Sequence, residues 1–511
     1  MGFEPVHRHE DRPYEWVGAW TERRALLTPD APALTEVHRD RTWTYAELDA
    51  RADRTARWLA DRDIGGGDRL VVIARNRVEI LDLFFATGKL GAVLAPLSHR
   101  LATGAIADLV DLVQPSLLVV EDRFEGRLTD VDTDVETVVL DEDDPFTAEH
   151  ANDGPIRTEP RSLADPHLLL HTGGTTGTPK ETVITHGSIL WNSVNTITGW
   201  GLSADDVTPM VFPFFHTGGW NVLTVPFVHM GGHLIIDRVV EPGDILEAID
   251  RYDATVLVAA PAVLRAMSRH ETWDRRDLSS LRFVKSGGGP CRPDVIAAWR
   301  ERGVDLSQGY GLTECGPNNF GMPPEGAATR PDSVGRLMPH VDARVVDEEG
   351  EPVSSGEVGE LELASPHAAD RYWRNESETS DTFGDGWVST GDLARIDEDD
   401  FVYIEGRIKH MYVSGGENVY PGEVESAIAE HPSVDDVVVI GVADDDWGEV
   451  GMAIVQAGER FDLETLRAFL DDRLARYKHP RHLRFVDEMP TSGPDKVDRQ
   501  ALRARFVTEN R

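Results

Sequence analysis

A short apolar segment that runs into a glycine- and threonine-rich loop places the strongest constraint on this chain. Leu168–Leu170 predict a buried strand, and Thr172–Lys180 contain three glycines, four threonines and one lysine within nine residues. Glycines allow the backbone to turn with its N–H groups pointing inward, which creates a concave site for anions. Threonine hydroxyls and the Lys180 ammonium suit this loop to a polyphosphate, although it lacks the ending of a Walker loop. The alternative is a flexible surface turn.

Strand-like and helix-like segments alternate on both sides of this loop. Strands are predicted at 69–74, 92–95, 116–120, 137–140, 233–236, 255–259 and 281–285, and helices at 45–59, 79–90, 102–113, 186–199, 244–252 and 262–269. This order predicts an α/β fold with a mostly parallel sheet. Short alternating strands at 343–346, 358–363 and 401–404 then indicate an antiparallel, barrel-like section. A glycine-rich joint at 406–416 leads into a small α+β tail with a helix predicted at 463–476.

The charge balance restricts the partners of the protein. Lys and Arg number 51 against 90 Asp and Glu, a formal net charge of −39. This balance argues against nucleic acid or an anionic membrane as the main partner. Only six lysines occur, and an acid-rich, lysine-poor composition resembles that of proteins from salt-loving archaea. Hydrophobic residues reach 40% and are patterned, so an acidic disordered chain is not expected.

The two cysteines, Cys291 and Cys315, lack the spacing of a metal or redox site, and we expect both to be small buried residues. The polar N-terminal sequence does not have the pattern of a signal peptide. No apolar run approaches the ~20 residues needed to cross a bilayer. A cytoplasmic location is therefore predicted.

Five further motifs accompany the loop. They are FFHTGGW at 214–220, QGYGLTE at 308–314, STGD at 389–392, GRIKHMYVSGGENVYP at 406–421 and TSGPDKVDR at 491–499. In this order, and over nearly the whole chain, the six motifs resemble those of the adenylate-forming acyl-CoA synthetases. The resemblance implies an α/β fold class, with a large N-terminal part of two α/β subdomains plus a β-barrel section, and a small mobile α+β C-terminal domain.

The resemblance also implies a two-step reaction and its participants. A carboxylate attacks the α-phosphate of ATP to give acyl-AMP and pyrophosphate, and a thiol, usually that of coenzyme A, then displaces AMP. ATP, Mg²⁺ and coenzyme A as co-substrate are expected, together with a small carboxylic acid. A homodimer is possible. Residues 1–408 correspond to the AMP-binding domain and 409–511 to the mobile domain.

Matching positions give the nucleotide residues that the resemblance implies. Those for ATP are Thr172, Gly173, Gly174, Thr175, Thr176, Gly177, Lys180, Gly287, Gly288, Gly289, Tyr310, Gly311, Thr313, Asp392 and Arg407. The loop would hold the β- and γ-phosphates, and glycines would let the adenine ring approach closely. Asp392 suits the ribose hydroxyls, because a carboxylate accepts two hydrogen bonds. Thr172 and Glu314 match the magnesium contacts and offer the oxygen ligands that this cation prefers.

The remaining roles follow in the same way. Lys496, Glu314 and His216 correspond to catalytic positions, and Lys409 to the hinge. Gly415 and Gly416 would let the pantetheine arm of coenzyme A pass close to the backbone. Two positions depart from the family pattern. Gly173 replaces its usual serine, and Glu181 replaces the usual glycine after the loop lysine; we expect Glu181 to be exposed, since an inward carboxylate would weaken phosphate binding.

The acyl pocket is predicted from the spacing of His216 and Trp220. This spacing resembles that of long-chain fatty acyl-CoA synthetases, in which a tryptophan gates the acyl tunnel, and the apolar run 222–228 could line it. A medium- or long-chain fatty acid is therefore predicted. The alternatives are that Trp220 is a core aromatic, that the enzyme is an aryl- or short-chain-acid CoA ligase, or that the protein is a nucleotide-sensing pseudoenzyme. An amino-acid-activating enzyme is disfavoured, because Phe214 and Phe215 offer no acidic partner for a substrate ammonium group.

Overall fold

The computed structural model describes residues 16–141, 146, 156, 161–172, 180–323, 326–444, 446–490 and 497–507. Within the described ranges, no helix is long and apolar enough to span a membrane. Both cysteines are buried, as predicted. Gly173, Gly174, Thr175, Thr176, Gly177 and Lys496 lie outside the described residues.

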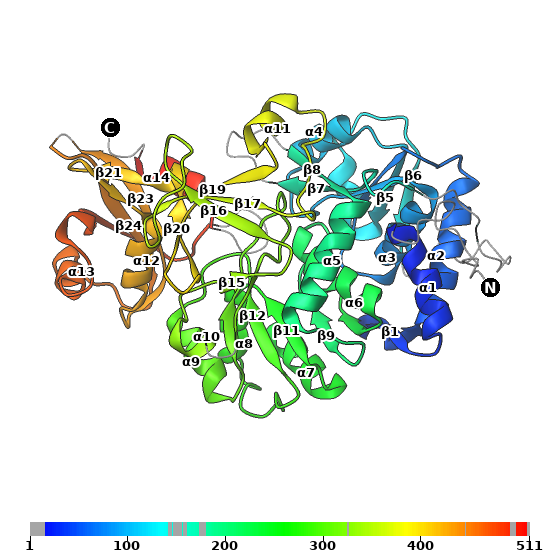
Figure 1. The fold of residues 1–511 in the computed structure, drawn as a ribbon, viewed down its shortest axis with the longest axis horizontal. Coiled ribbons are helices and arrows are strands. Elements are labelled where there is room, and N and C mark those ends of the chain that lie inside the picture. The colour runs from blue at the N-terminus through cyan, green and yellow to red at the C-terminus, as the bar shows by residue number, and fades with distance from the viewer. Residues whose placement is uncertain are drawn as a thin grey trace, which may run out of the picture.

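A six-stranded sheet carries the phosphate-loop segment. Its strand order is β6-β5-β3-β4-β7-β8, and every neighbouring pair is parallel except β7 and β8. The strands are β3 (Arg69–Ile73), β4 (Val93–Pro96), β5 (Leu117–Glu121), β6 (Thr137–Leu140), β7 (Pro166–Thr172) and β8 (Lys180–Thr185). The accompanying helices are α2 (Tyr45–Ala60), α3 (Val78–Leu90), α4 (Thr103–Val113) and the 3₁₀ segment η4 (Asp122–Leu128). These residues form the blue and cyan end of the ribbon (Figure 1).

Local sequence explains the ends of these helices. The side chain of Thr44 accepts from the backbone N–H of Glu47, whose carboxylate accepts from the backbone N–H of Thr44, so the predicted capping box starts α2. Helix α3 ends at Gly91, whose φ of +73° is the left-handed conformation that glycine adopts readily. Every residue of helix α3 is buried, and its three charged side chains, Glu79, Asp82 and Lys89, all form ion pairs.

Two smaller sheets form the second α/β region. Their orders are β2-β1-β10-β9 and β11-β12-β13. The strands are β1 (Pro32–Glu36), β2 (Arg41–Thr44), β9 (Val207–Met210), β10 (His233–Ile236), β11 (Val256–Ala259), β12 (Phe283–Ser286) and β13 (Leu306–Gln308). The helices are α1 (Trp20–Leu27), α5 (His186–Trp200), α6 (Thr224–Met230), α7 (Pro242–Tyr252), α8 (Pro261–Ser268) and α9 (Pro293–Glu301), with short turns at Val17–Ala19, Val37–Arg39 and Gly218–Val222.

The predicted antiparallel section follows. Its sheet has the order β16-β17-β19-β18, and β20 pairs with β19. Its elements are β14 (Phe320–Gly321), β15 (Arg336–Leu337), β16 (Asp342–Val346), β17 (Gly359–Ala364), β18 (Phe383–Gly384), β19 (Trp387–Ile396) and β20 (Val402–Arg407), with helices α10 (Gly326–Thr329) and α11 (Glu376–Thr382). The alternation of buried and half-buried residues along β17 and β19 agrees with a sheet that has one core face.

The C-terminal part, residues 411–507, has its own sheet of order β22-β21-β24-β23 with β25 beside β24. Its elements are β21 (Tyr412–Ser414), β22 (Glu417–Val419), β23 (Val434–Asp444), β24 (Gly448–Ala457), β25 (His482–Val486), α12 (Pro421–Ala429), α13 (Leu463–Leu470) and α14 (Arg499–Val507), with a short turn at Arg476–Lys478. It lies at the opposite end of the molecule from α1 and α2 (Figure 1). The predicted α/β, barrel-like and α+β sections are confirmed, but the helix predicted to 476 ends at Leu470.

Candidate active site

The two ends of the phosphate loop are adjacent strands. Thr172 at the end of β7 pairs across the ladder with Lys180 at the start of β8. Strands β7 and β8 are antiparallel, so Thr172 and Lys180 lie at the same edge of the sheet. This edge is at the carboxyl end of β7, where ligands bind in open α/β sheets.

Lys180 already has partners at this edge. Its ammonium forms an ion pair with the carboxylate of Glu378 on α11 and lies 5.1 Å from the ring centroid of Tyr372. Only 9% of Lys180 is exposed. A buried ammonium is stabilised by a carboxylate and by an aromatic face. A phosphate group that bound Lys180 would therefore share the ammonium with Glu378 or displace it.

The expectation that Glu181 is exposed is wrong. Glu181 is fully buried, and its nearest charged partner is the Nδ1 atom of His171, 3.6 Å from its Oε1 atom across the ladder. The side chain lies on the same face of β8 as Val183, which belongs to an apolar cluster with Leu169 and residues of α4. Burial raises the pKa of the Glu181 carboxyl above its usual range, and His171 acts in the opposite direction.

Tyr372 joins Lys180 to Glu314. The Tyr372 hydroxyl donates to Oε1 of Glu314 over 2.8 Å, while its ring lies beneath the Lys180 ammonium. Burial raises the pKa of Tyr372 above its usual range, and the Glu314 carboxylate raises it further. The hydroxyl is therefore held protonated as a donor. This contact fixes the Glu314 carboxylate, and the backbone oxygen of Glu314 also accepts from the backbone N–H of Ala369 over 2.8 Å.

A second group forms around Asp392 on β19. Its carboxylate accepts from the Tyr310 hydroxyl over 2.6 Å and from Nε of Arg407 over 2.7 Å. The backbone N–H of Asp392 donates to Oγ1 of Thr390 over 3.1 Å, and the residue is 4% exposed. Burial, followed by the Asp392 charge, raises the pKa of Tyr310 well above its usual range. Three residues predicted from separate motifs are thus brought together.

The glycines predicted to flank adenine have open space beside them. A Cβ atom at Gly288 would meet nothing within 4 Å, and one at Gly287 or Gly289 would reach a neighbour only at 4.0 Å. Gly311 differs, because a Cβ there would lie 2.3 Å from the backbone of Pro317. Gly311 is therefore required for close packing of the chain, whereas Gly287–Gly289 leave an unfilled surface suited to a flat ring. Thr313 is buried.

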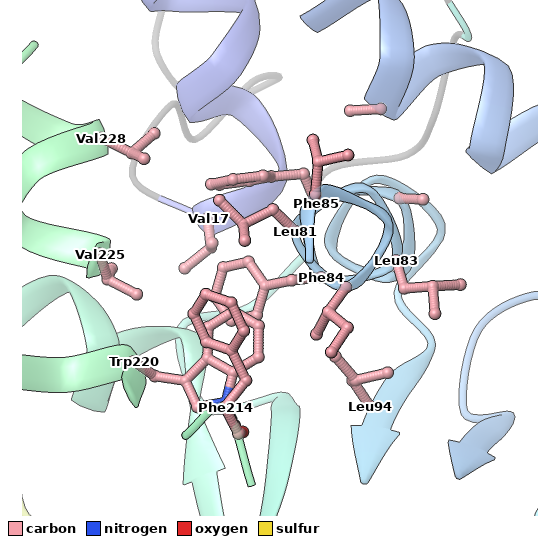
Figure 2. Close-up of a cluster of buried hydrophobic side chains, with 14 of the residues drawn as sticks. Val17, Leu81, Leu83, Phe84, Phe85, Leu94, Phe214, Trp220, Val225 and Val228 are labelled. Atoms are coloured by element: carbon pink, nitrogen blue, oxygen red, sulfur yellow. Dashed lines mark hydrogen bonds between the residues drawn. The ribbon is translucent and has the colours of Figure 1, made fainter. Parts of the chain in front are cut away.

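Trp220 lies in the core rather than at a surface. It is fully buried, its Nε1 donates to the backbone oxygen of Phe214 over 2.5 Å, and its ring stacks on Phe84 with centroids 4.5 Å apart (Figure 2). Phe214 contacts the same ring, with centroids 4.6 Å apart. His216 accepts at Nδ1 from the backbone N–H of Gly218 over 3.1 Å. This packing supports the core-aromatic alternative, and the gating role stays a prediction.

The hinge position follows Arg407 of the Asp392 group by two residues, and the coenzyme A positions lie in the C-terminal part. Lys409 is exposed in the 3₁₀ turn Ile408–His410, between the last strand of the antiparallel section and β21. Gly415 and Gly416 occupy the exposed turn between β21 and β22, both with positive φ. A Cβ at Gly415 would lie 2.6 Å from the Trp447 ring. In Figure 1 this hairpin lies at the far side of the C-terminal part from β7 and β8.

Two contributors were not predicted from the sequence. Tyr372 is 58 residues along the chain from its partner Glu314, and Glu378 is 198 residues from its partner Lys180. Neither distance follows from a helical or strand period, so no local pattern could pair them. A usable signal is the isolated aromatic pair Tyr372–Trp373 in a polar stretch, because buried aromatics with a polar tip normally have a hydrogen-bond partner.

Comparison with known proteins decides the family. A family model described as AMP-binding enzyme matches residues 21–373, and one described as AMP-binding enzyme C-terminal domain matches residues 423–496. The chain belongs to the AMP-binding enzymes. It is an AMP-forming acyl-CoA synthetase, as predicted: it activates a carboxylic acid with ATP and uses coenzyme A as co-substrate.

Individual members of this AMP-binding enzyme family align over almost their whole length. Feruloyl-CoA synthase from Amycolatopsis is 35% identical over 500 residues, covering 96% of this chain and 99% of that protein. Indoleacetate–CoA ligase from Aromatoleum aromaticum is 33% identical, covering 95% and 97%. The structure of ATP-bound MatB from Rhodopseudomonas palustris is 30% identical with a TM-score of 0.90, covering 97% of this chain and 100% of that one.

Proposed function

We propose that the acid activated by this synthetase is a compact aromatic carboxylic acid. The observation that carries the proposal is the packing of Trp220, which is locked by a buried hydrogen bond to Phe214 and by stacking on Phe84 (Figure 2). Opening a tunnel at Trp220 would break that hydrogen bond and expose core surface, each of which costs free energy. The similarity to relatives named for feruloyl and indoleacetate substrates supports the same class.

A medium- or long-chain fatty acid is the second candidate. It is favoured by the spacing from His216 to Trp220 and by the apolar run 222–228. That run forms the end of the π-helical turn Gly218–Val222 and most of α6, and its side chains are buried in the main core. A chain-length-dependent tunnel would therefore require these core residues to move apart.

In the first half-reaction, the described residues hold the nucleotide at two ends. We assign the phosphates to Lys180, Thr172 and the loop from Gly173 to Gly177. Asp392 and Arg407 bind the ribose, and Gly287–Gly289, Tyr310, Gly311 and Thr313 surround adenine. Glu314 fits a magnesium ligand, because Tyr372 fixes one carboxylate oxygen while a carboxylate has further acceptor sites. Magnesium there would neutralise phosphate charge.

Negative charge builds on the oxygens of the α-phosphate as the acid carboxylate attacks. We assign Lys496 to the stabilisation of that charge and His216 to the acid side of the site. In the second half-reaction the C-terminal domain, proposed to span residues 409–511 after the AMP-binding domain of 1–408, rotates about Lys409. The rotation brings Gly415 and Gly416 toward the thiol path, because β21, which leads into their turn, lies across the molecule from β7 and β8 in the arrangement described (Figure 1).

A matched panel of acids tests the substrate class. Pyrophosphate release and CoA-ester formation are measured with ferulate, indoleacetate, octanoate and palmitate, each with and without coenzyme A. The proposal expects the highest kcat/KM for the two aromatic acids. A preference for palmitate supports the fatty-acid candidate, and the absence of pyrophosphate release with every acid supports the pseudoenzyme. Trp220→Phe, which keeps the stacking but not the hydrogen bond, should leave the acid preference unchanged if Trp220 is a core residue.

Separate single-turnover assays test the two mobile-domain residues. Lys496→Ala should lose acyl-AMP formation by roughly 10²–10³-fold, as for removal of one preplaced donor. It should still convert supplied acyl-AMP and coenzyme A to thioester. Lys409→Pro should show the reverse pattern, because a fixed φ obstructs rotation. Equal damage to both steps in the Lys496 variant would contradict the assigned role.

We also propose a cytoplasmic, salt-adapted protein that can form a homodimer. The net charge of −39 repels itself and anionic ATP, and ~1 M salt shortens the Debye length to ~3 Å. Stability and ATP affinity should therefore rise with salt. Thermal unfolding, ATP titration and sedimentation across a salt series test this; full activity and unchanged melting in dilute buffer would contradict it.

A further inference from the structure

Arginines from two helices of the N-terminal part converge on one turn of the C-terminal part. Arg292 directly precedes α9 and donates to the backbone oxygens of Ala429 over 2.9 Å and Asp435 over 3.2 Å. Arg265 on α8 donates to the same Asp435 oxygen over 2.6 Å and lies 3.4 Å from its carboxylate. Arg269 stands at the edge, 3.8 Å from that carboxylate. All of these contacts cross from residues before the proposed hinge to residues after it.

The accepting groups are suited to this role. Ala429 is the last residue of α12, so its carbonyl is one of those that a helix leaves without an internal partner. Such carbonyls carry the partial negative charge of the helix end, which attracts a cation. Arg292 satisfies that oxygen with one arm of its guanidinium and reaches Asp435 with the other, the forked geometry that only arginine provides.

Without the contacts to this turn, the positive charges of the three arginines would repel one another. Burial lowers the pKa of Arg265, and the positive charges of Arg269 and Arg292 lower it further. The carboxylate of Asp294 accepts from Nε of Arg292 over 2.9 Å, which leaves the outer nitrogens for the C-terminal part. The contacts of Asp435 and Ala429 therefore compensate a like-charge cluster, so that moving the C-terminal part away exposes unbalanced positive charge.

The same backbone reaches the adenine side of the site. Arg292 follows the Gly287–Gly289 segment by three residues, and the N–H of the intervening Cys291 donates to the side chain of Gln308 over 2.9 Å. Gln308 begins the motif that contains Tyr310. Only Pro290 and the anchored Cys291 therefore separate Arg292 from the Gly287–Gly289 segment.

We propose that Arg292 and Arg265 are positioning residues that latch the C-terminal part in the arrangement seen here, and that this latch favours acyl-AMP formation and opens before thioester formation. The inference rests on the proposed two-step function. It follows from the position of β21, which leads into the turn of Gly415 and Gly416 and lies across the molecule from β7 and β8 (Figure 1). The latch thus selects between the two half-reactions without contacting a substrate.

Half-reaction kinetics test the latch. The double variant Arg265→Ala/Arg292→Ala should slow acyl-AMP formation by roughly 10- to 100-fold, as expected for the loss of charged hydrogen bonds. Thioester formation from supplied acyl-AMP and coenzyme A should be unchanged or faster. Arg292→Lys keeps the positive charge but loses the two-armed guanidinium group. Its rate of acyl-AMP formation should therefore fall between those of the wild type and the double variant. Arg269→Ala is the matched control and should change either step by less than about threefold, because that pair is exposed.

A distance measurement makes the test independent of turnover. Spin labels at Asp205→Cys and Asp472→Cys, both exposed, report on the two parts, while Cys291 and Cys315 are buried and should remain unlabelled. The latch predicts one main distance with native arginines and a broader or longer distribution in the double variant. Equal slowing of both half-reactions, or an unchanged distribution with unchanged kinetics, would overturn it. If wild type activates no acid, the proposed function fails, yet the distances still decide the latch.

Discussion

The two ends of the proposed nucleotide site, the ribose end at Asp392 and the phosphate end at Lys180, differ in how far their charges are satisfied before a nucleotide arrives. At the ribose end, Asp392 accepts from Tyr310 and Arg407 and its backbone is fixed by Thr390. At the phosphate end, Lys180 is paired with Glu378, whose side chain is 31% exposed. The first end is a network of several hydrogen bonds around one buried carboxylate, and the second is a single ion pair with a partly exposed carboxylate.

This difference predicts that the two ends have different roles, one in ATP affinity and the other in the rate of acyl-AMP formation. A carboxylate with about four acceptor sites can keep Arg407 and Tyr310 and still accept from two ribose hydroxyls, so Asp392 binds without rearrangement. If Lys180 binds phosphate, it loosens or leaves its pair with Glu378, and it then stabilises phosphate most where negative charge develops in the transition state. The ribose end should therefore govern ATP affinity, whereas the phosphate end should govern the rate of acyl-AMP formation.

The largest expected effect is at the ribose end. Asp392→Ala removes two charged hydrogen bonds to ribose, each worth about 1.5–3 kcal/mol, so kcat/KM for ATP should fall by roughly 10²–10⁴-fold, mostly through KM. Steady-state kinetics with varied ATP measure this. Glu398→Ala, which changes an exposed residue in the turn after β19, is the control and should leave kcat/KM for ATP unchanged. A loss confined to kcat would show that the ribose end, like the phosphate end, governs the rate rather than ATP affinity.

Lys180→Met should have a smaller effect than Asp392→Ala, and it should change the rate of acyl-AMP formation rather than KM for ATP. The rate of acyl-AMP formation should fall by roughly 10²–10³-fold, while ATP binding changes much less. Lys180→Arg keeps the charge and should recover part of the rate. Single-turnover formation of acyl-AMP and equilibrium ATP titration separate the two quantities. A pure loss of ATP affinity would show that both ends serve binding alone.

The sequence was sufficient for the architecture and for three site residues that the structure brings into contact. Alternating apolar segments indicated the parallel sheet, because strands and helices differ in hydrophobic period. Asp392, Tyr310 and Arg407 were each predicted from a separate motif, and the structure places them in contact. What the motifs could not give was the contact itself, since Tyr310 and Asp392 are 82 residues apart and the packing of whole sheets brings them together.

The phosphate end was predicted less well, for the same reason. Glu181 was expected at the surface because a carboxylate that points inward would weaken phosphate binding. Strand β8 was not predicted, so nothing in the sequence indicated that Glu181 would point to the α4 side beside His171. The partners of Lys180 come from residues 372–378, in a stretch without periodic pattern. Long-range pairing, not local propensity, decides these positions.

Glu181 provides a pH test of the phosphate end. Its folded-state pKa is raised, so between the usual value of 4.5 and the raised value the folded protein binds more protons than the unfolded chain. Stability should therefore fall as pH rises through this window, by about 1.4 kcal/mol for each pH unit that the window spans. Glu181→Gln removes the titrating proton, so it should be the more stable form at pH 7 and lose that advantage near pH 4.

Urea unfolding of both proteins from pH 4 to 8 measures this difference, because other titrating groups are common to the two. The opposite trend, with the wild type gaining on the glutamine variant as pH rises, would mean that His171 binds the carboxylate as a true ion pair. The charges at the phosphate end would then be satisfied before a nucleotide arrives, as they are at the ribose end.

The smallest expected effect is a gain. Glu378→Gln releases Lys180 from its carboxylate and removes a negative charge that faces the incoming phosphates, so KM for ATP should fall by about two- to fivefold, the size of a partly exposed ion pair. Glu376→Gln is the matched control: it lies on the same helix, is exposed and changes the net charge equally. Initial rates with varied ATP at fixed salt compare the two. If only the Glu378 variant binds ATP more tightly, the phosphate end is held incomplete by that residue. If both variants gain equally, the benefit comes from the total charge of the protein; if the Glu378 variant binds ATP more weakly, the carboxylate positions Lys180 for phosphate rather than competing with it.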